Sequence, residues 1–373
     1  MAGIYIHIPF CKQACHYCDF HFSTSLKYKD ELLQALVKEI NLQKAYLDNE
    51  TIETIYFGGG TPSVLSAGEL NMLIGAITGL HTVAANAEIT IEANPDDLDK
   101  AKLLALKQTD INRFSIGIQS FFDDDLIWMN RVHRAAEAEA AIKRAQDSGF
   151  ENITVDLIYG YPLLSDQKWK YNLGKVFELS VPHVSSYSMT VEPQTALASF
   201  INKKKQPAMD DQQSAAQFVV LMEAMKTHDF EHYEISNFCK PGHYSRHNSN
   251  YWKGVKYLGI GPSAHSYNGE TRQWNVANNA KYIQSLEKDE ILAETELLTE
   301  TNRLNEYIMT SLRTMWGLDL KKLNTIATGA EAELAKTAQR YFESGWIEQK
   351  DNIITLTAIG KLYADNIAGG LFF

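Results

Sequence analysis

Hydrophobic residues follow two different spacings along the first half of the chain. Short apolar runs rich in isoleucine, phenylalanine and valine predict buried strands, and longer segments with an apolar residue at every third or fourth position predict amphipathic helices. Within residues 27–46, for example, Leu32, Leu36 and Ile40 fall on one face of a helix. The predicted strands cover residues 3–8, 54–57, 87–92, 112–118, 152–158 and 183–191, and the predicted helices include 27–46, 98–107, 123–130, 135–148 and 166–179.

The six predicted strands are separated by helices. Strand–helix alternation on this scale is typical of a parallel sheet with helices outside it. The fold class is therefore α/β, and we expect an open (β/α)6 barrel, that is, a partial TIM-type barrel. Ligands of such sheets bind at the carboxyl ends of the strands, so residues that directly follow a predicted strand are candidates for a binding site.

The second half of the chain leaves this alternation. A long amphipathic helix is predicted over residues 210–226, and the strand- and turn-rich segment 255–274 is expected to pack over the barrel mouth. Beyond residue 299 the pattern predicts three helices, a hairpin with strands at 346–349 and 353–356, and a last helix, which suggests a winged-helix-like domain. The predicted domains are a barrel (1–200), a linking region over the barrel mouth (201–298) and a mostly helical C-terminal domain (299–373).

Net charge and the distribution of apolar residues exclude several classes of function. The net charge of −11 argues against a broad nucleic-acid or anionic membrane surface. Basic and acidic residues nearly balance in the C-terminal domain, so we expect a lid that contacts protein or haem there and not a DNA reader. No apolar run approaches the roughly 18–20 residues that span a bilayer, and residues 1–8 lack the features of a signal peptide. We therefore expect a cytoplasmic protein with no nucleic-acid partner and no direct membrane span.

Three of the four cysteines, Cys11, Cys15 and Cys18, lie on a predicted loop after the first strand, at C-x3-C-x2-C spacing. Three clustered thiolates favour iron–sulfur or zinc. In a [4Fe–4S] cluster, three cysteines leave one iron without a protein ligand, and that iron can chelate the amine and carboxylate of S-adenosylmethionine. The alternative is a structural zinc site, for which the candidate fourth ligands are the nearby histidines His7, His16 and His21.

Further polar positions follow the later strands. The GGGTP segment at residues 58–62 is not a phosphate-binding P-loop, because no Gly-Lys-Ser/Thr follows, and its glycines suit backbone that approaches a ligand closely. Glu92 ends the third predicted strand, and its carboxylate can hold a ribose hydroxyl or an amine. Gln119 ends the fourth predicted strand. Arg131 is suited to bidentate binding of a carboxylate. Asp156 interrupts an apolar strand and needs a partner or a ligand, because an unpaired buried charge is costly.

The cysteine motif, with an aromatic residue before its third cysteine, resembles the signature of the radical SAM superfamily. Together with the segments YIHIPFC, GGGTP, IEANP, GIQS and DLIYG, which cover roughly half the chain, it looks like the coproporphyrinogen III dehydrogenase (HemN-type) subgroup. This resemblance implies that the three cysteines ligate a [4Fe–4S] cluster. It also implies a set of S-adenosylmethionine contacts, namely Tyr5, Tyr17, Gly59, Gly60, Thr61, Glu92, Gln119, Arg131 and Asp156.

Two departures from the oxidase of this subgroup match its HemW branch of haem chaperones. Phe20 stands where the oxidase has a fourth cysteine, and only ten residues precede Cys11. Residues 247–252 read as the H-N-x-x-Y-W motif of that branch, which implies haem b bound at His247 and handed to haem-dependent respiratory or membrane proteins. Independently of the resemblance, a histidine beside tyrosine and tryptophan offers an axial imidazole and flat aromatic faces for a macrocycle.

Two other functions stay open at this point. One is oxidative decarboxylation of a porphyrinogen propionate by a radical SAM enzyme of porphyrin biosynthesis, and the other is a structural zinc protein. The sequence does not decide between a monomer and a homodimer.

Overall fold

The computed structural model describes all of residues 1–373. Its centre is a 12-stranded sheet in the order β12-β11-β10-β9-β1-β2-β3-β4-β5-β6-β8-β7. The strands β1 to β6 follow one another in the sheet as they do in the sequence, and every neighbouring pair among them is parallel. Their bounds are β1 (Ala2–Ile8), β2 (Ile52–Gly59), β3 (Val83–Ala93), β4 (Arg113–Gln119), β5 (Ile153–Tyr159) and β6 (His183–Ser188).

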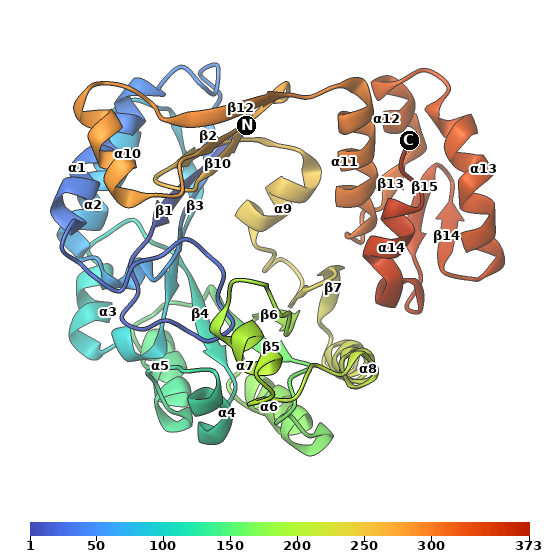
Figure 1. Cartoon of the computed structure of the whole chain (residues 1–373), viewed down its shortest axis with the longest axis horizontal. Helices are drawn as coiled ribbons and strands as arrows, with labels where there is room; N and C mark the ends of the chain where they lie inside the picture. The colour runs from blue at the N-terminus through green and yellow to red at the C-terminus, as the bar shows by residue number, and fades with distance from the viewer.

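Helices connect these strands and cover the outside of the sheet (Figure 1). They carry the apolar stripe that the spacing predicts, and in α1 the buried side chains include Leu32, Leu33, Leu36 and Ile40. The expected (β/α)6 partial barrel is confirmed. The connecting helices are α1 (Lys29–Leu42), α2 (Ala67–Thr78), α3 (Lys100–Leu106), α4 (Asp123–Trp128), α5 (Ala135–Asp147), α6 (Asp166–Glu178) and α7 (Ala196–Asn202), with short 3-10 turns η1 (Pro62–Val64) and η2 (Pro95–Asp97).

The segment after the barrel extends the sheet at both ends. β9 (Lys256–Ile260) pairs in parallel with β1, and β8 (Asn237–Cys239) pairs antiparallel with β6. Pairing satisfies backbone groups that the free edges of an open barrel would otherwise expose. The expectation that residues 255–274 cover the barrel mouth is therefore wrong. The other elements of this segment are α8 (Asp211–Thr227), β7 (Glu231–Glu234), α9 (Arg246–Lys253), β10 (His265–Tyr267), β11 (Thr271–Asn275), α10 (Asn279–Glu287) and β12 (Ala293–Leu297).

The C-terminal part folds around its own hydrophobic cluster, separate from that of the barrel. Its order of three helices, a hairpin and a last helix is the predicted one, and a short strand after the first helix completes a three-stranded sheet. Leu371, in the apolar tail, is buried in this cluster. Figure 1 shows this part in red beside the barrel, with α9 between them. Its elements are α11 (Glu300–Leu312), β13 (Leu318–Asp319), α12 (Leu320–Ile326), α13 (Ala330–Glu343), β14 (Ile347–Lys350), β15 (Ile353–Leu356), η3 (Gly360–Tyr363) and α14 (Ala364–Gly369).

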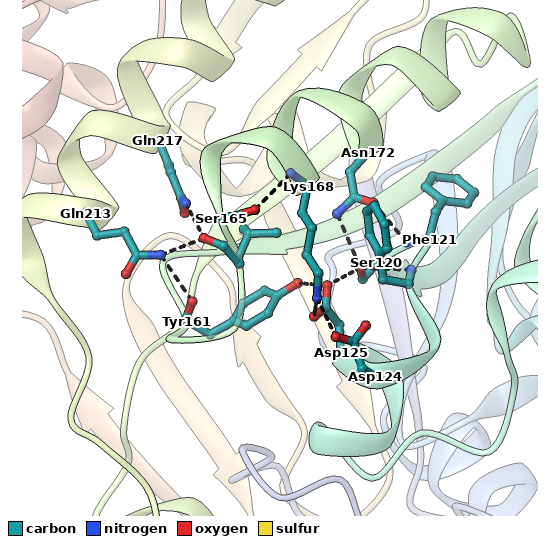
Figure 2. A network of polar contacts seen from close by, with 12 residues as sticks. Ser120, Phe121, Asp124, Asp125, Tyr161, Ser165, Lys168, Asn172, Gln213 and Gln217 are labelled. Carbon is teal, nitrogen blue, oxygen red and sulfur yellow. Dashed lines mark hydrogen bonds and ion pairs between the residues drawn. The ribbon is translucent and has the colours of Figure 1, made fainter.

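A polar network joins α4, α6 and α8 on the outer side of the barrel (Figure 2). At its centre the fully buried carboxylate of Asp125 accepts hydrogen bonds from the hydroxyl of Ser120 (2.8 Å), the hydroxyl of Tyr161 (2.7 Å) and Nζ of Lys168 (2.7 Å). From α8, Gln217 donates to the carbonyl of Leu164 at 2.8 Å. These bonds hold the first helix after the barrel against the β/α units.

No helix of the chain combines the length and the hydrophobicity that crossing a bilayer requires.

Candidate functional site

The cysteine loop begins where Pro9 ends β1. The backbone N–H of Cys11 donates to the carbonyl of Ser23 at 3.0 Å, and Ser23 donates back to the carbonyl of Pro9 at 2.8 Å. Further along, the backbone N–H of His16 reaches the carbonyl of Met129, beyond β4, at 3.1 Å. The loop is therefore fastened both to its own return segment and to the fourth β/α unit.

The three thiols line one cavity of about 630 Å³ at the carboxyl ends of the strands. Burial raises the pKa of Cys11 above its ordinary value and that of Cys18 to about 12, so a bound metal must displace protons from both. Nowhere do three or more His, Cys, Asp or Glu side chains converge closely enough to enclose a single metal ion. The thiols instead border a space that a larger group can occupy.

The histidines of the zinc alternative are bonded elsewhere. Nε2 of His7 lies 2.9 Å from the carbonyl of His21, and Nδ1 of His16 lies 2.9 Å from the carbonyl of Trp128. The ring of His21 bonds to Asn279 at 2.7 Å. None of the three lines the cavity with the thiols, so the structure offers none of them as a fourth ligand.

The GGGTP segment lies against the start of the cysteine loop. The backbone N–H of Gly60 donates to the carbonyl of Ile8 at 2.9 Å, and that of Thr61 donates to the carbonyl of Phe10 at 2.7 Å. A Cβ at Gly60 would lie 2.7 Å from the Phe10 carbonyl oxygen, which only glycine avoids. Gly59, Gly60 and Thr61 all border the cavity, as the strand-end position predicts.

Two carboxylates, on strands β3 and β5, line the same cavity from inside the barrel. Glu92 accepts from the hydroxyl of Tyr56 (2.9 Å) and from the N–H of Gly59 (3.1 Å), and Asp156 accepts from the hydroxyl of Ser115 (3.2 Å). Burial raises the pKa of Glu92 to about 7, and the negative charge of Asp156 adds to this rise. Burial also raises the pKa of Asp156, to about 6. A ligand that carries positive charge or hydroxyl donors would stabilise this pair in its charged form.

Arg131 lies between the cysteine loop and the strand ends. Its Nη2 donates to Asn94 (2.6 Å) and to the carbonyl of Gly117 (2.7 Å), and its Nη1 lies 3.5 Å from Sγ of Cys15. Its Nε is buried and has no partner in the protein. Nearby, Gln119 has φ 66°, a left-handed backbone that non-glycine residues adopt mostly where the surroundings impose it. One buried N–H of the guanidinium is therefore accepted by no group of the protein.

The structure brings most of the predicted site residues together and leaves two apart. Tyr5 does not line the cavity, and its hydroxyl bonds to Nδ1 of His7 at 3.2 Å. His247 does not line it either. The predicted residues that line the cavity are Cys11, Cys15, Cys18, Tyr17, Gly59, Gly60, Thr61, Glu92, Gln119, Arg131 and Asp156.

His247 lies inside the barrel, toward the opposite ends of the strands. It is only 2% exposed, its Nδ1 lies 2.8 Å from the hydroxyl of Thr54, and its Nε2 lies 2.8 Å from the hydroxyl of Tyr251. Burial lowers its pKa to about 3, so the imidazole is neutral. Both ring nitrogens are thus hydrogen-bonded within the protein. The segment that carries His247 packs into the barrel at the end opposite the cavity and, contrary to the expectation from the sequence, does not cover the barrel mouth.

Sequence reasoning missed several residues of the cavity wall. Tyr187 lies near the carboxyl end of the sixth strand and carried the same strand-end signal as Glu92. Arg313 and Asp365 come from the C-terminal part, where no local pattern marks them. Nε of Arg313 donates to Glu234 at 3.2 Å, which attaches this part of the chain to β7 beside the cavity.

Comparison with known proteins agrees with this architecture. Residues 5–172 match the Radical SAM superfamily, and residues 298–363 match the HemN C-terminal domain. The chain is 34% identical to the Bacillus subtilis protein named heme chaperone HemW over 373 residues, which cover 99% of this chain and 98% of that protein. It is also 34% identical to a Mycobacterium tuberculosis protein of the same name, over 98% of this chain and 93% of the relative.

The chain belongs to the HemW family of radical SAM proteins. A third relative of that name, from Escherichia coli, is 36% identical over 70% of this chain and 69% of its own length. Among solved structures, the radical SAM enzyme coproporphyrinogen III oxidase (HemN) of Escherichia coli superimposes with a TM-score of 0.85 at 23% identity, over 100% of this chain and 90% of that one. This likeness establishes the fold.

Membership of the superfamily implies a [4Fe–4S] cluster and S-adenosylmethionine as cofactors. The cavity fits such an occupant on three counts, namely three thiols on one border, Gly59 and Gly60 in its wall, and a guanidinium in the same lining as two half-buried carboxylates.

Proposed function

We propose that the protein is a haem chaperone, which binds haem b and hands it to haem-dependent respiratory or membrane proteins. The observation that carries this proposal is the 34% identity, over nearly the full length of both chains, to relatives named heme chaperone HemW. Cys11, Cys15 and Cys18 would hold the [4Fe–4S] cluster, and the cavity beside them would hold S-adenosylmethionine.

Within this proposal different residues of the cavity bind different groups of S-adenosylmethionine. Arg131, in the cavity lining, would bind a carboxylate, and the backbone of Gly59 and Gly60 would admit an amine close to the strand ends. Glu92 and Asp156 would accept from hydroxyls or from the amine, which relieves the repulsion between the two half-buried acids. When bound, the cluster supplies the electron that can cleave the sulfonium of S-adenosylmethionine.

For haem, we propose the segment of His247, Tyr251 and Trp252. Because His247 is buried and both its nitrogens are bonded, coordination of haem iron requires that Tyr251 release Nε2 and that α9 move out of the barrel. Helix α9 is short, from Arg246 to Lys253, and packs between the barrel and α11, so its displacement leaves the main sheet intact.

The second candidate is the oxidase reaction, in which a radical SAM enzyme decarboxylates a porphyrinogen propionate. The TM-score of 0.85 to coproporphyrinogen III oxidase favours it at the level of fold. In the cysteine loop, however, Phe20 occupies the position at which the oxidase would carry its fourth cysteine, and its side chain is exposed. The absence of that thiol favours the chaperone.

Haem titration of the anaerobically reconstituted protein separates the two candidates. We expect a saturable change in the Soret absorbance of haem, weakened at least about tenfold in affinity by His247→Ala, and no decarboxylated product from coproporphyrinogen III. His228→Ala is the matched control, because His228 lies on the surface, stacked on Phe177. Failure to bind haem together with porphyrinogen decarboxylation would establish the oxidase instead.

The cytoplasmic location stays a prediction of the sequence, which cell fractionation would test. Sedimentation of the reconstituted protein, with and without haem, would decide between a monomer and a homodimer.

A further inference from the structure

Strands β2 and β3 reach both ends of the barrel interior. Their pairing places Gly3, Thr54 and Glu88 in one layer and Tyr5, Tyr56 and Thr90 in the next layer toward the cavity. Because alternate residues of a strand share a face, the inward face of β3 carries both Glu88 and Glu92, and Glu92 is the one nearer the cavity. The same two strands therefore line the cofactor cavity and contact α9.

Tyr56 links these two layers through two different parts of its side chain. Its hydroxyl donates to Oε1 of Glu92 at 2.9 Å, at the border of the cavity. Its ring stacks on the imidazole of His247, with the ring centres 4.9 Å apart and the planes 25° from parallel. The side chain is 8% exposed and also packs against the ring of Tyr5, so it has little room to move without displacing a neighbour.

The first turn of α9 is fastened to the same strands. Glu88 accepts from the backbone N–H groups of Arg246 and His247, each at 3.0 Å, and Thr54 bonds the His247 ring. Oε2 of Glu92 accepts only from the N–H of Gly59, in the GGGTP segment. A ligand that donates to Glu92 from the cavity would therefore share this carboxylate with the Tyr56 hydroxyl and the GGGTP backbone, and a shift of the carboxylate toward the ligand would stretch the bond to Tyr56.

We propose that Tyr56 couples the cavity beside the cysteine loop to the His247 segment. A ligand that donates to Glu92 would shift the stacked Tyr56 ring and thereby change the contacts between the barrel strands and α9. This inference rests on the proposed function, since it assigns the two ends to S-adenosylmethionine and to haem. It makes Tyr56 a positioning residue that touches neither ligand's reacting atoms. Coupling is reciprocal, so each ligand must change the affinity for the other by the same factor.

The test is a linkage cycle on the full-length, cluster-loaded protein. Haem affinity is measured from the Soret absorbance with and without saturating S-adenosylmethionine, and S-adenosylmethionine affinity is measured by calorimetry with and without haem. In the wild type we expect each ligand to change the affinity for the other by about fivefold or more. In Tyr56→Phe, which keeps the ring on His247 but removes the hydrogen bond to Glu92, we expect both ligands to bind and the factor to fall to less than twofold.

Tyr257→Phe is the matched control. Tyr257 belongs to the same run of aromatic rings, 4.6 Å from Tyr251, but its hydroxyl makes no hydrogen bond to Glu92. We expect this variant to keep the wild-type factor. Unchanged coupling in Tyr56→Phe, or independent binding of the two ligands to the wild type, would overturn the inference and leave the proposed function standing. A wild type that binds no haem would overturn both.

Discussion

Glu88 and Glu92 stand four residues apart on the inward face of β3, and each accepts two hydrogen bonds at a different level of the barrel. Glu88 receives the backbone N–H groups of Arg246 and His247, whereas Glu92 receives the Tyr56 hydroxyl and the Gly59 N–H. One acid thus fixes the start of a helix and the other borders a ligand cavity. The titration of Glu92 and the packing around it lead to testable consequences.

The first prediction concerns the pH dependence of stability. Because burial raises the pKa of Glu92 from 4.5 to about 7, the folded state binds a proton that the unfolded state has already lost between these two values. The free energy of unfolding therefore falls as the pH rises through this window. Relative to Glu92→Gln, the ligand-free wild type should lose about 2 kcal/mol between pH 5 and pH 8.

Urea unfolding of both proteins across this range measures that difference. Buried histidines such as His7 and His133, whose pKa values burial lowers to about 4, change stability in the opposite direction, but they are common to both proteins. Parallel curves for the wild type and Glu92→Gln would contradict the raised pKa.

The second prediction separates the clustered thiols from the remaining one. Replacing Cys11, Cys15 or Cys18 by serine should abolish or strongly reduce the iron and sulfide retained after anaerobic reconstitution, because all three border one cavity. Cys239→Ser should retain the wild-type content, because Cys239 is fully buried in β8, away from that cavity. Equal iron loss in all four variants would show that the loss reflects general unfolding.

The third prediction compares two neighbouring aspartates that both pair with Lys168 at 2.7 Å. Asp125 is fully buried and holds three donors, so Asp125→Ala should destabilise the protein by about 3 kcal/mol. The side chain of Asp124 is 65% exposed, and Asp124→Ala should cost less than about 1 kcal/mol. Chemical denaturation of the two variants is the measurement, and similar losses for both would refute the role of the buried network.

The fourth prediction concerns space at Gly58. A Cβ there would lie 2.8 Å from the ring of Tyr5, 2.9 Å from that of Tyr56 and 3.1 Å from Oε1 of Glu92. Gly58→Ala should therefore cost about 1–3 kcal/mol of stability. A Cβ at Gly75, inside α2, would have no neighbouring atom within 4 Å, and Gly75→Ala should stabilise the protein by about 0.5–1 kcal/mol. Thermal melts that shift in the same direction for both variants would count against this packing.

Local pattern was a good guide wherever one short segment decides the outcome. The predicted strands near residues 54–57, 112–118 and 152–158 agree with β2, β4 and β5 to within about two residues at each end. The strand-end rule then placed Thr61 and Glu92 at one cavity, because carboxyl ends of parallel strands meet at the same edge of a sheet, and Asp156, inside β5, lines the same cavity. The predicted hairpin near the C-terminus is also present, with Asp351 and Asn352 between its strands.

Pattern failed where the outcome depends on contact between two distant segments. Nothing in residues 256–260 distinguishes a strand that pairs with β1 from one that covers the barrel mouth, and that pairing follows from the free backbone of Ala2–Ile6. Similarly, the motif around His247 suggested an accessible ligand, whereas Gly3 leaves room beside Thr54 for a buried imidazole. Arg313 reaches the cavity only because the C-terminal part docks on β7.

The sequence alone determined the β/α alternation, the three-thiol loop and the strand-end positions of the candidate ligands, because each depends on residue types and spacings within a few consecutive positions. Only the tertiary structure decided that β9 closes against β1, that His247 stacks on Tyr56 inside the barrel, and that Arg313 borders the cavity. These contacts join residues far apart in the chain, and they depend on which edge pairs its backbone and which side chain fills the space that the strands leave.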